Sequence, residues 1–457
     1  MKKIQSVLLI IIGCLALVAC NNSSTTTTTT YSEALVTSLT FAANDSFPGL
    51  KQASFTIITA TDTGYIFNRD SLLFGTVLDS VIPRFTFNHT PAYSMLCCGS
   101  DTIVYSGSDT VNMSVKPCRL YVMASDRENF KWYDIDISVH AVDPDLYIWE
   151  QLTPAVYFAD GGENKAFLLD GTFYLFTNDG FRVLLYTSDD GVLWSDEMVV
   201  TGLPTDCSVR HITLANGIFY YGKEASLYYS ANGIDWGADD YSSEDFEIVN
   251  TLCEYNDSLW CIVKDNSTDA LLFATCAAGE PLVPFSEAYV LPDDFPVSDF
   301  CAVTFASKSL RPRLMVIGGY DRYGNILNTR WNVEFLPNRG YTVANFSIEQ
   351  PDFTELSGVS VVYYNHELHL FGGSNKNNEI AENTQLVSID EGLHWTIPDS
   401  SKNLLPQEYM PRQKATVLTD EDNYIYIIGG SSRTQVFSDV WRGRLNSTTF
   451  SDYENWW

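Results

Sequence analysis

A strand–turn–strand unit recurs through the later two thirds of the chain, and this repeat limits the possible folds more than any other feature. Two apolar runs flank Asp170-Gly171 within 166–176, and two more flank Asn216-Gly217 within 212–221. Such pairs form two-residue hairpin turns, because both central positions need positive φ. Looser versions follow at 256–258, 365–367 and 422–423. The two glycines are 46 residues apart, which leaves room for four strands per unit and predicts the blades of a β-propeller.

Counting these hairpins predicts six units within the 457 residues, near 150–200, 205–246, 247–292, 298–346, 353–400 and 410–457. A seventh is possible if the run near Trp149 closes with the C-terminus. The predicted fold class is therefore all-β, with an N-terminal β-sandwich followed by a propeller of six or seven blades.

Three strands in the later half end alike, at Val316-Ile317-Gly318-Gly319, Leu370-Phe371-Gly372-Gly373 and Ile427-Ile428-Gly429-Gly430. A polar loop follows each one and leads to Trp331, Leu386 and Trp441 respectively. This pattern resembles the kelch repeat. The resemblance implies that the glycines allow a tight turn at the strand end and that the Trp packs between blades. Leu386 departs from the pattern in the middle repeat.

Three other turns have the form Ser-x-Asp/Asn-Gly-x-x-Trp, the third with one residue inserted. They resemble the Asp-box of sialidase-type propellers, and the resemblance implies a structural role at the blade periphery. The side-chain oxygen caps its own turn, glycine takes positive φ, and Trp enters the core. The turns consist of Ser188, Asp190, Gly191 and Trp194; Ser230, Asn232, Gly233 and Trp236; and Ser388, Asp390, Gly392 and Trp395.

The region before the repeats reads as a separate small β domain. Candidate strands at 54–60, 81–88, 102–106, 118–124 and 132–140 predict an antiparallel, Ig-like β-sandwich over 35–143. In the last of these, Tyr133, Ile135, Ile137 and Val139 share one face. Asp143-Pro144-Asp145 breaks the pattern, and the kelch-like propeller is expected over 146–457.

The first residues read as an export signal. Two lysines precede a short apolar run, and the predicted signal peptide covers 1–19. The run ends at Leu17-Val18-Ala19-Cys20, which resembles a bacterial lipobox and implies cleavage before Cys20 and acylation of that residue. An ordinary signal with an incidental Cys20 is the alternative. Residues 20–34, rich in Thr, are expected to be a flexible tether. We therefore expect an outer-membrane lipoprotein held by its lipid anchor, on a periplasmic or surface face that the sequence leaves open.

Charge and cysteine content exclude some partners. The formal net charge of −30 would repel polyphosphate, so no nucleic acid partner is expected. The cysteines after Cys20 form no Cys-x-x-Cys pair, so no zinc site is expected. They are either buried free thiols or disulfides, and Cys253 with Cys261, which flank a hairpin, are the best disulfide candidates.

No known catalytic set is present. Galactose-oxidase copper chemistry needs two His and two Tyr ligands, whereas the only close histidines, His366 and His369, should point to opposite faces of a strand. The element nearest to the Arg-Ile-Pro of sialidases is Val209-Arg210-His211-Ile212. The acidic stretch 239–245 lacks the order of an EF-hand loop and reads as a solvated loop rather than a Ca²⁺ site. We expect no metal, no cofactor and no catalytic residues that the sequence can name.

The expected function is binding. Long polar loops follow the Gly-Gly strands, and their side chains suit sugar hydroxyls or a protein surface. The candidate binding residues are Tyr320, Asp321, Arg322, Tyr323, Asn375, Lys376, Asn377 and Arg433. The chain looks like bacterial lipoproteins that join a small β domain to a kelch or galactose-oxidase-like propeller, so we predict a non-catalytic module for a glycan or protein ligand. The alternative is a glycan-active hydrolase or lyase with an unrecognised carboxylate pair at the channel.

Overall fold

A computed structural model describes residues 29–44, 47–156, 163–285, 290–336, 340–347, 350, 352–377, 379–380, 385–399, 405–406 and 408–446. The predicted signal peptide, Cys20 and most of the predicted tether lie outside these residues. The chain divides into two compact units, Met1–Pro144 and Asp145–Trp457. In the described part of the chain, no helix is both long and apolar enough to cross a membrane.

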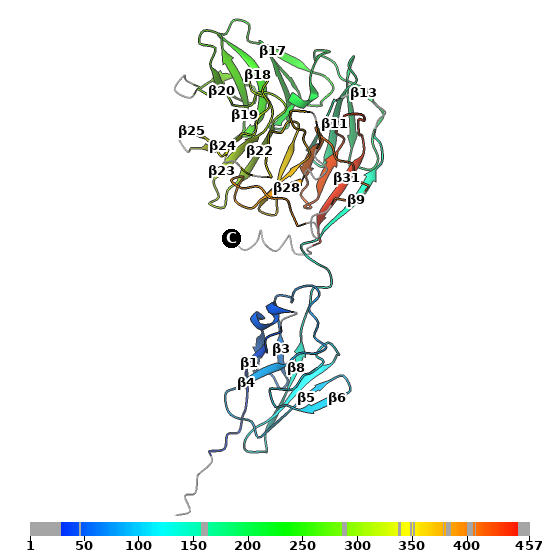
Figure 1. Ribbon diagram of the computed structural model, residues 1–457, viewed down its shortest axis with the longest axis vertical. Coiled ribbons are helices and arrows are strands. Elements are labelled where there is room, and N and C mark those ends of the chain that lie inside the picture. The colour runs from blue at the N-terminus through cyan, green and yellow to red at the C-terminus, as the bar shows by residue number, and fades with distance from the viewer. Residues whose placement is uncertain are drawn as a thin grey trace, which may run out of the picture. The chain divides into compact units, whose positions relative to one another are not determined.

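The first unit consists of two sheets and one short 3-10 helix around a single core (Figure 1). Its core draws Val36, Leu39 and Phe85 from one sheet and Leu120 and Tyr133 from the other. The elements are β1 (Val36–Phe41) with β4 (Pro83–Phe87); β2 (Thr56–Ile58), β3 (Gly64–Phe67), β8 (Phe130–Asp136), β7 (Cys118–Met123), β5 (Tyr93–Cys98) and β6 (Asp101–Val104) in that sheet order; and η1 (Pro48–Gln52).

The pairing in this unit differs from the expected antiparallel sandwich at one place. β3 runs parallel to β8, with Ile66 opposite Ile135. Parallel neighbours need a long crossover, and here the chain forms β4 to β7 between them. The predicted alternation in β8 is confirmed, since Tyr133 and Ile135 are buried while Phe130 is exposed.

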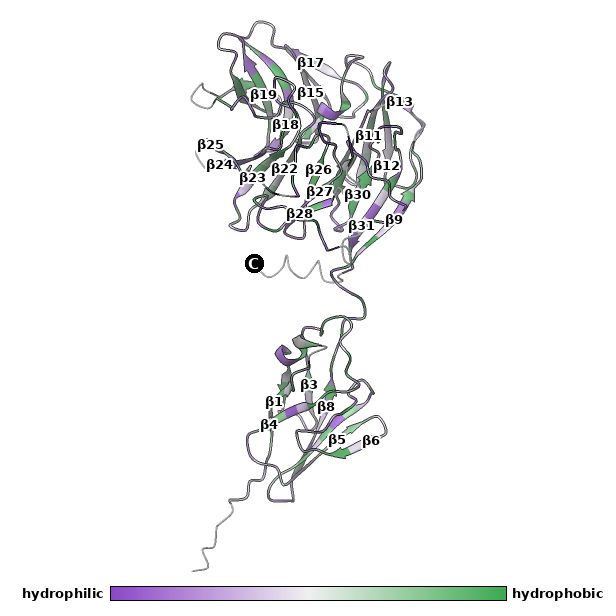
Figure 2. Ribbon diagram, in the orientation of Figure 1, coloured by the Kyte–Doolittle hydropathy of each residue, from purple (hydrophilic) through white to green (hydrophobic). Residues whose placement is uncertain are grey.

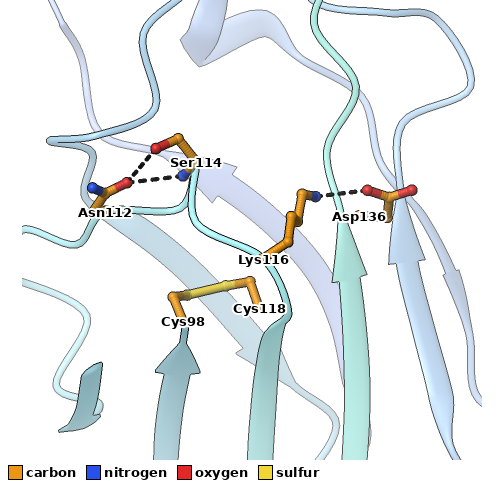
Figure 3. Close-up of a disulfide and its surroundings, with 6 residues drawn as sticks. All are labelled: Cys98, Asn112, Ser114, Lys116, Cys118 and Asp136. Atoms are coloured by element: carbon orange, nitrogen blue, oxygen red, sulfur yellow. Dashed lines mark hydrogen bonds and ion pairs between the residues drawn. A yellow bond between two sulfur atoms is a disulfide. The ribbon is translucent and has the colours of Figure 1, made fainter. Parts of the chain in front are cut away.

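A disulfide joins the ends of two neighbouring strands in the first unit. Cys98 ends β5 and Cys118 begins β7, and the two lie directly opposite each other in the ladder (Figure 3). The expected Cys253–Cys261 pair is wrong, because both are free, buried thiols. In register, Cys253 faces Trp260 while Cys261 faces Thr251, so the two sulfurs lie in different cores on opposite sides of their sheet.

The described residues of the second unit form six antiparallel sheets, which confirms the predicted propeller and gives it six blades. Five sheets follow the chain in order, and the sixth is completed by a strand from the start of the unit. The blades are β10 (Glu163–Leu169), β11 (Thr172–Asn178), β12 (Val183–Ser188) and β13 (Met198–Val199); β14 (Thr213–Ala215), β15 (Ile218–Lys223), β16 (Ser226–Ser230) and β17 (Gly237–Asp240); β18 (Phe246–Tyr255), β19 (Ser258–Asp265), β20 (Leu271–Ala277) and β21 (Val283–Pro284); β22 (Cys301–Ala306), β23 (Pro312–Ile317), β24 (Arg330–Phe335) and β25 (Tyr341–Asn345); β26 (Ser360–Tyr364), β27 (Glu367–Phe371) and β28 (Gln385–Ser388); and β29 (Thr416–Thr419), β30 (Ile425–Ile428), β31 (Val440–Leu445) and β9 (Tyr147–Thr153).

The blades close into a ring (Figure 1). Each pair of neighbouring blades shares one apolar core, and the sixth blade shares one with the first through Tyr426 and Phe173. The apolar strands that supply these cores run through every blade in Figure 2. β9 pairs with β31, so the run near Trp149 completes the sixth blade instead of adding a seventh. The 3-10 helix η2 (Val209–His211) precedes β14 at the innermost edge of the second blade.

The three Gly-Gly strands occupy the same place in their blades. Val316 pairs with Trp331, Leu370 with Leu386, and Ile427 with Trp441, so Leu386 takes the Trp position of the fifth blade. The first glycine of each Gly-Gly sequence lies two residues after Val316, Leu370 or Ile427, respectively, and has positive φ. At Gly372 a Cβ would also collide with the main-chain oxygen of Arg412. Both the positive φ and this contact therefore exclude a side chain there.

Candidate functional site

The channel of the propeller contains a cavity of about 310 Å³. Residues from the innermost strand of every blade line it, together with η2. We define the channel mouth as the end at which the innermost strands begin. It is formed by Glu163, Lys165, Arg210, Asp299, Gly358 and Lys414.

Backbone geometry repeats around half of this mouth. Asp299, Gly358 and Lys414 each stand two residues before their innermost strand, and all three have positive φ. Gly358 N donates to Asp299 O at 2.9 Å, and Lys414 N donates to Gly358 O at 2.6 Å. Positive φ turns each main chain toward the next blade, so these hydrogen bonds tie three blades together at the mouth.

Side chains continue the ring across the other blades. The Nη1 of Arg210 donates to Lys414 O at 3.1 Å. The Nζ of Lys165 donates to Arg210 O at 2.9 Å and to Ile212 O at 2.6 Å. Two basic side chains are therefore fixed at the mouth by main-chain oxygens.

Two carboxylates share the third basic side chain. The Nζ of Lys414 lies 2.9 Å from Asp299 Oδ2 and 4.0 Å from Glu163 Oε1. Ser208 also donates to Glu163 Oε2 at 2.6 Å. Since both carboxylates lie within reach of one ammonium nitrogen, they stand close together at the mouth.

Burial changes the protonation of the groups between these charges. Burial, with a smaller contribution from the positive charge of Arg210, lowers the pKa of Lys165 to about 7. It also lowers the pKa of His211 to about 4, so this imidazole is neutral at pH 7. Burial raises the pKa of the Cys301 thiol, which accepts a hydrogen bond from Val361 N.

Two polar atoms on the channel wall have no hydrogen-bond partner in the described part of the chain. One is Nε of Arg210, a donor, and the other is Oδ1 of Asn250, an acceptor. Asn250 is only 2% exposed, and its amide nitrogen donates to Val297 O at 2.9 Å. Leaving a buried polar group unpaired costs about 1–3 kcal/mol. Both atoms are covered by neighbouring side chains, so a polar ligand or water would offset this cost only after those side chains shift.

The predicted binding residues lie in the Gly-Gly loops, and several of them shape those loops. Oδ1 of Asp321 accepts from the main-chain nitrogens of Tyr323 and Asn325, both at 2.8 Å. Oδ1 of Asn375 accepts from those of Asn377 and Glu379. Both residues follow their Gly-Gly pair by two positions, so their side chains cap turns.

The other predicted residues differ in accessibility. Arg322 is held by Asp269 and Asp293, and the Tyr320 hydroxyl accepts from Ser357 Oγ at 3.2 Å. Four side chains stay exposed: Tyr323, Lys376, Asn377 and Arg433. They belong to loops that leave the second strand of a blade, which in an antiparallel blade is the end where the innermost strand begins. The exposed residues therefore border the same end as the channel mouth.

The three Ser-x-Asp/Asn-Gly turns share one hydrogen-bond pattern. In each, the glycine nitrogen donates to the Ser oxygen and the Trp Nε1 donates to the glycine oxygen at 3.0–3.1 Å. The inserted Glu391 takes positive φ and keeps this pattern in the third copy. Each turn follows the third strand of its blade, at the end opposite the channel mouth.

Other candidate positions stay apart. His369 is fully buried on β27, whereas His366 is exposed in the preceding turn. Asp240, in the acidic stretch 239–245, is exposed and accepts from Ser242 N at 2.8 Å. Among the described residues, no group of three His, Cys, Asp or Glu side chains is placed to hold a metal ion.

Sequence reasoning missed Lys165, Glu163, Asp299 and Lys414 and passed over Arg210. Their positions in the repeat could have indicated them, because each lies at the start of an innermost strand or just before it. In three of the blades the residue at the mouth precedes the innermost strand by two positions. Aligning the six repeats on the start of the innermost strand predicts that a polar residue or a glycine from several blades lies at one end of the channel.

Family models match both parts of the chain. The model described as "DUF6242 beta propeller domain" matches residues 143–453, and that described as "Domain of unknown function (DUF6242) N-terminal domain" matches residues 19–137. No curated protein matches the chain.

Solved structures resemble the propeller at low identity. "Structure of YjhT" has a TM-score of 0.45 at 10% identity and covers 63% of this chain and 96% of that chain. The alpha-L-arabinanase of Penicillium chrysogenum complexed with arabinobiose has a TM-score of 0.39 at 11% identity, with 65% and 97% covered. The endo-arabinase of Bacteroides thetaiotaomicron has a TM-score of 0.32 at 13% identity, with 64% and 96% covered.

Proposed function

Because the chain belongs to the DUF6242 family, in which a propeller domain accompanies a separate N-terminal domain, we propose that it is a cell-envelope lipoprotein whose propeller binds a glycan. The binding site is the channel mouth. The lipid anchor is attached at Cys20, and the propeller is of the kelch-like type. The proposed ligand is a glycan, and the experiment below distinguishes it from a protein partner.

One observation carries the proposal. The wall of the cavity holds an unpaired donor, Arg210 Nε, and an unpaired acceptor, Asn250 Oδ1, which a ligand reaches once the side chains that cover them shift. Sugar hydroxyls both donate and accept, so a single sugar residue can satisfy both atoms. An apolar peptide anchor would leave both unsatisfied, at the cost of their desolvation.

Export is supported by two features. The apolar run and the Leu-Val-Ala-Cys sequence favour a lipid-anchored precursor. The Cys98–Cys118 disulfide favours an oxidising compartment outside the cytoplasm. Mass spectrometry of the purified protein tests the anchor: we expect acylation at Cys20, lost in Cys20→Ser, and an unmodified N-terminus would contradict it.

Glycan binding is tested with the full chain on an array of bacterial and dietary polysaccharides. We expect binding to at least one glycan, and a loss of tenfold or more in Asn250→Ala. Arg311→Gln, in the exposed turn between β22 and β23 away from the channel mouth, is the matched control and should keep the affinity within about twofold. Capture of a protein partner with no glycan bound would replace the proposal.

A second function is favoured by the carboxylates. Glu163 and Asp299 both lie within 4.0 Å of Lys414 Nζ, so the two carboxylates stand close enough for us to propose them as an acid–base pair of the glycosidase kind. In such a hydrolase one of the two would protonate the leaving oxygen while the other acts as base or nucleophile. Release of reducing ends from a bound glycan, abolished in Glu163→Gln and Asp299→Asn, would support this function over binding alone.

A further inference from the structure

Basic side chains are scarce in this protein, yet they gather at the channel mouth. The chain has 27 Lys and Arg against 57 Asp and Glu. Three of these cations, Lys165, Arg210 and Lys414, come from three different blades and meet at one end of one channel. Lys165 contacts the main chain of Arg210, and Arg210 contacts the main chain of Lys414, so the three residues form one connected series.

The three cations are not equally neutralised. Lys414 is paired with Asp299 and lies at the edge of contact with Glu163. Arg210 has no carboxylate within 4.0 Å among the described residues, and its hydrogen bond from Nη1 goes to a neutral carbonyl oxygen. A guanidinium is always charged and carries five N–H donors. The mouth therefore holds one unneutralised fixed cation with Nε still unpaired.

Lys165 adds a second donor beside that cation. Its Nζ uses two N–H groups on Arg210 O and Ile212 O, both contributed by the η2 segment. An ammonium group has a third N–H. Burial and, to a smaller extent, Arg210 disfavour this second positive charge and lower the pKa of Lys165. An anion bound between the two would offset that repulsion.

Asn250 defines the neighbouring position. Its Oδ1 is an unpaired acceptor beneath the same cavity wall, which a ligand reaches once the covering side chains shift, and its amide nitrogen is anchored on Val297 O. A ligand that satisfies the whole wall must present an anionic oxygen to Arg210 and Lys165 and a donor, such as a hydroxyl, to Asn250. One sugar residue that carries a carboxylate has both groups.

We infer that the channel mouth recognises an acidic sugar, a uronate residue of a glycan, whose carboxylate binds Arg210 and Lys165 and whose hydroxyl donates to Asn250. This inference rests on the proposed function and names its ligand class. Arginine suits the carboxylate because the planar guanidinium can donate two parallel hydrogen bonds to it.

The experiment measures binding of D-galacturonate and D-glucuronate to the full chain by calorimetry and saturation-transfer NMR. D-galactose and D-glucose are the neutral controls of the same size, and inorganic phosphate tests for a general anion site. We expect the uronates to bind at least tenfold more tightly than the neutral sugars. Arg210→Gln should lose that preference, and Arg210→Lys should retain part of it.

Controls separate loss of the site from loss of the fold. Arg311→Gln removes an exposed charge from the turn between β22 and β23, at the end of the blade away from the channel mouth, and should leave uronate affinity within about twofold. Circular dichroism shows whether Arg210→Gln remains folded, and Arg210→Lys keeps the test decisive if it does not. Lys165→Met should weaken uronate binding and leave the neutral sugars unaffected.

Each outcome decides the matter. Equal affinity for uronates and neutral sugars, or full uronate affinity in Arg210→Gln, overturns the inference while the proposed glycan function stands. Phosphate binding without uronate binding also overturns it, in favour of a phosphate site. Failure of the protein to bind any array glycan rejects the proposed function itself.

Discussion

The Nζ of Lys165 lies 2.9 Å from the main-chain oxygen of Arg210, and this hydrogen bond joins the first two blades at the channel mouth. The two side chains also repel each other when both are charged, which helps to lower the pKa of Lys165 to about 7. The same pair therefore provides both a structural link and a titrating group within reach of a ligand.

Uronate affinity should fall as the pH rises through 7. Lys165 is charged below its pKa and neutral above it, while the ligand carboxylate stays ionised throughout this range. Losing one cation beside the carboxylate should weaken binding by about fivefold or more. The other ionisable groups at the mouth are Glu163, Cys207, Arg210, His211, Asp299, Cys301 and Lys414.

Calorimetry on both sides of pH 7 measures this dependence, and Lys165→Met supplies the control. The variant should show the weaker affinity at every pH, with a flat profile. A wild-type profile that is flat, or one that rises with pH, would remove Lys165 from the binding site.

Breaking the buried ion pair of the sixth blade should destabilise the propeller. Nη1 of Arg412 lies 2.5 Å from Asp439 Oδ1, and the two side chains are only 1% and 11% exposed. Asp439→Asn leaves a buried guanidinium without its counter-charge, at an expected cost of about 3–5 kcal/mol. Arg311→Gln, which breaks the exposed pair with Glu334, should cost about 1 kcal/mol or less. Urea unfolding of the propeller transition measures both, and similar costs would contradict the prediction.

The Trp of the third capped turn should matter for stability and not for ligand binding. Trp395 is 2% exposed and donates to Gly392 O at 3.0 Å, at the end of its blade away from the channel mouth. Trp395→Ala should lower the free energy of unfolding by about 3–5 kcal/mol. The exposed Leu193→Ala should change it by about 0.5 kcal/mol or less. A folded Trp395→Ala protein with reduced uronate affinity would give this turn a functional role.

The disulfide should stabilise only the first unit. Cys98 and Cys118 are separated by 20 residues, a loop whose closure contributes about 3 kcal/mol. Replacing both by Ser should lower the unfolding midpoint of the N-terminal transition and leave the propeller transition in place. Calorimetric scans resolve the two transitions, and Cys97→Ser, a neighbouring free thiol, is the control. A shift of the propeller transition would show that the two units unfold together.

Local turn chemistry made the propeller predictable. Asp170-Gly171 and Asn216-Gly217 all take positive φ, as the hairpin pattern requires. The three Gly-Gly strands likewise occupy one register in their blades. These features depend on residues close in sequence, so the pattern itself contains them.

Features that depend on distant pairing were not predictable in the same way. Cys98 meets Cys118 because β5 pairs with β7 as well as with β6, which no hairpin pattern indicates. In β18 the register shift between Thr251 and Cys253 puts Cys253 on the face opposite to that of Cys261 on β19. One extra residue in a strand reverses the faces, so the expected Cys253–Cys261 pair failed there.

The channel mouth depends on ring closure. Arg210 and the main-chain oxygen it contacts on Lys414 are 204 residues apart, and they meet because six blades complete one turn. Polarity alone predicts the loop residues as ligand-binding. It cannot distinguish Asp321, whose side chain caps a turn, from a side chain that is free to bind a ligand.

Because β9 pairs with β31, the first strand of the propeller needs the last one as its partner. Arg442 on the last strand contacts Glu150 on the first, 292 residues earlier. The first strand of the propeller is thus made long before its partner and carries an unpaired edge while the other five blades are produced. β9 can pair with β31 and complete the sixth sheet only after residues 440–445 have left the ribosome. A chain interrupted before that point remains an open arc, with its first strand free to pair with another copy.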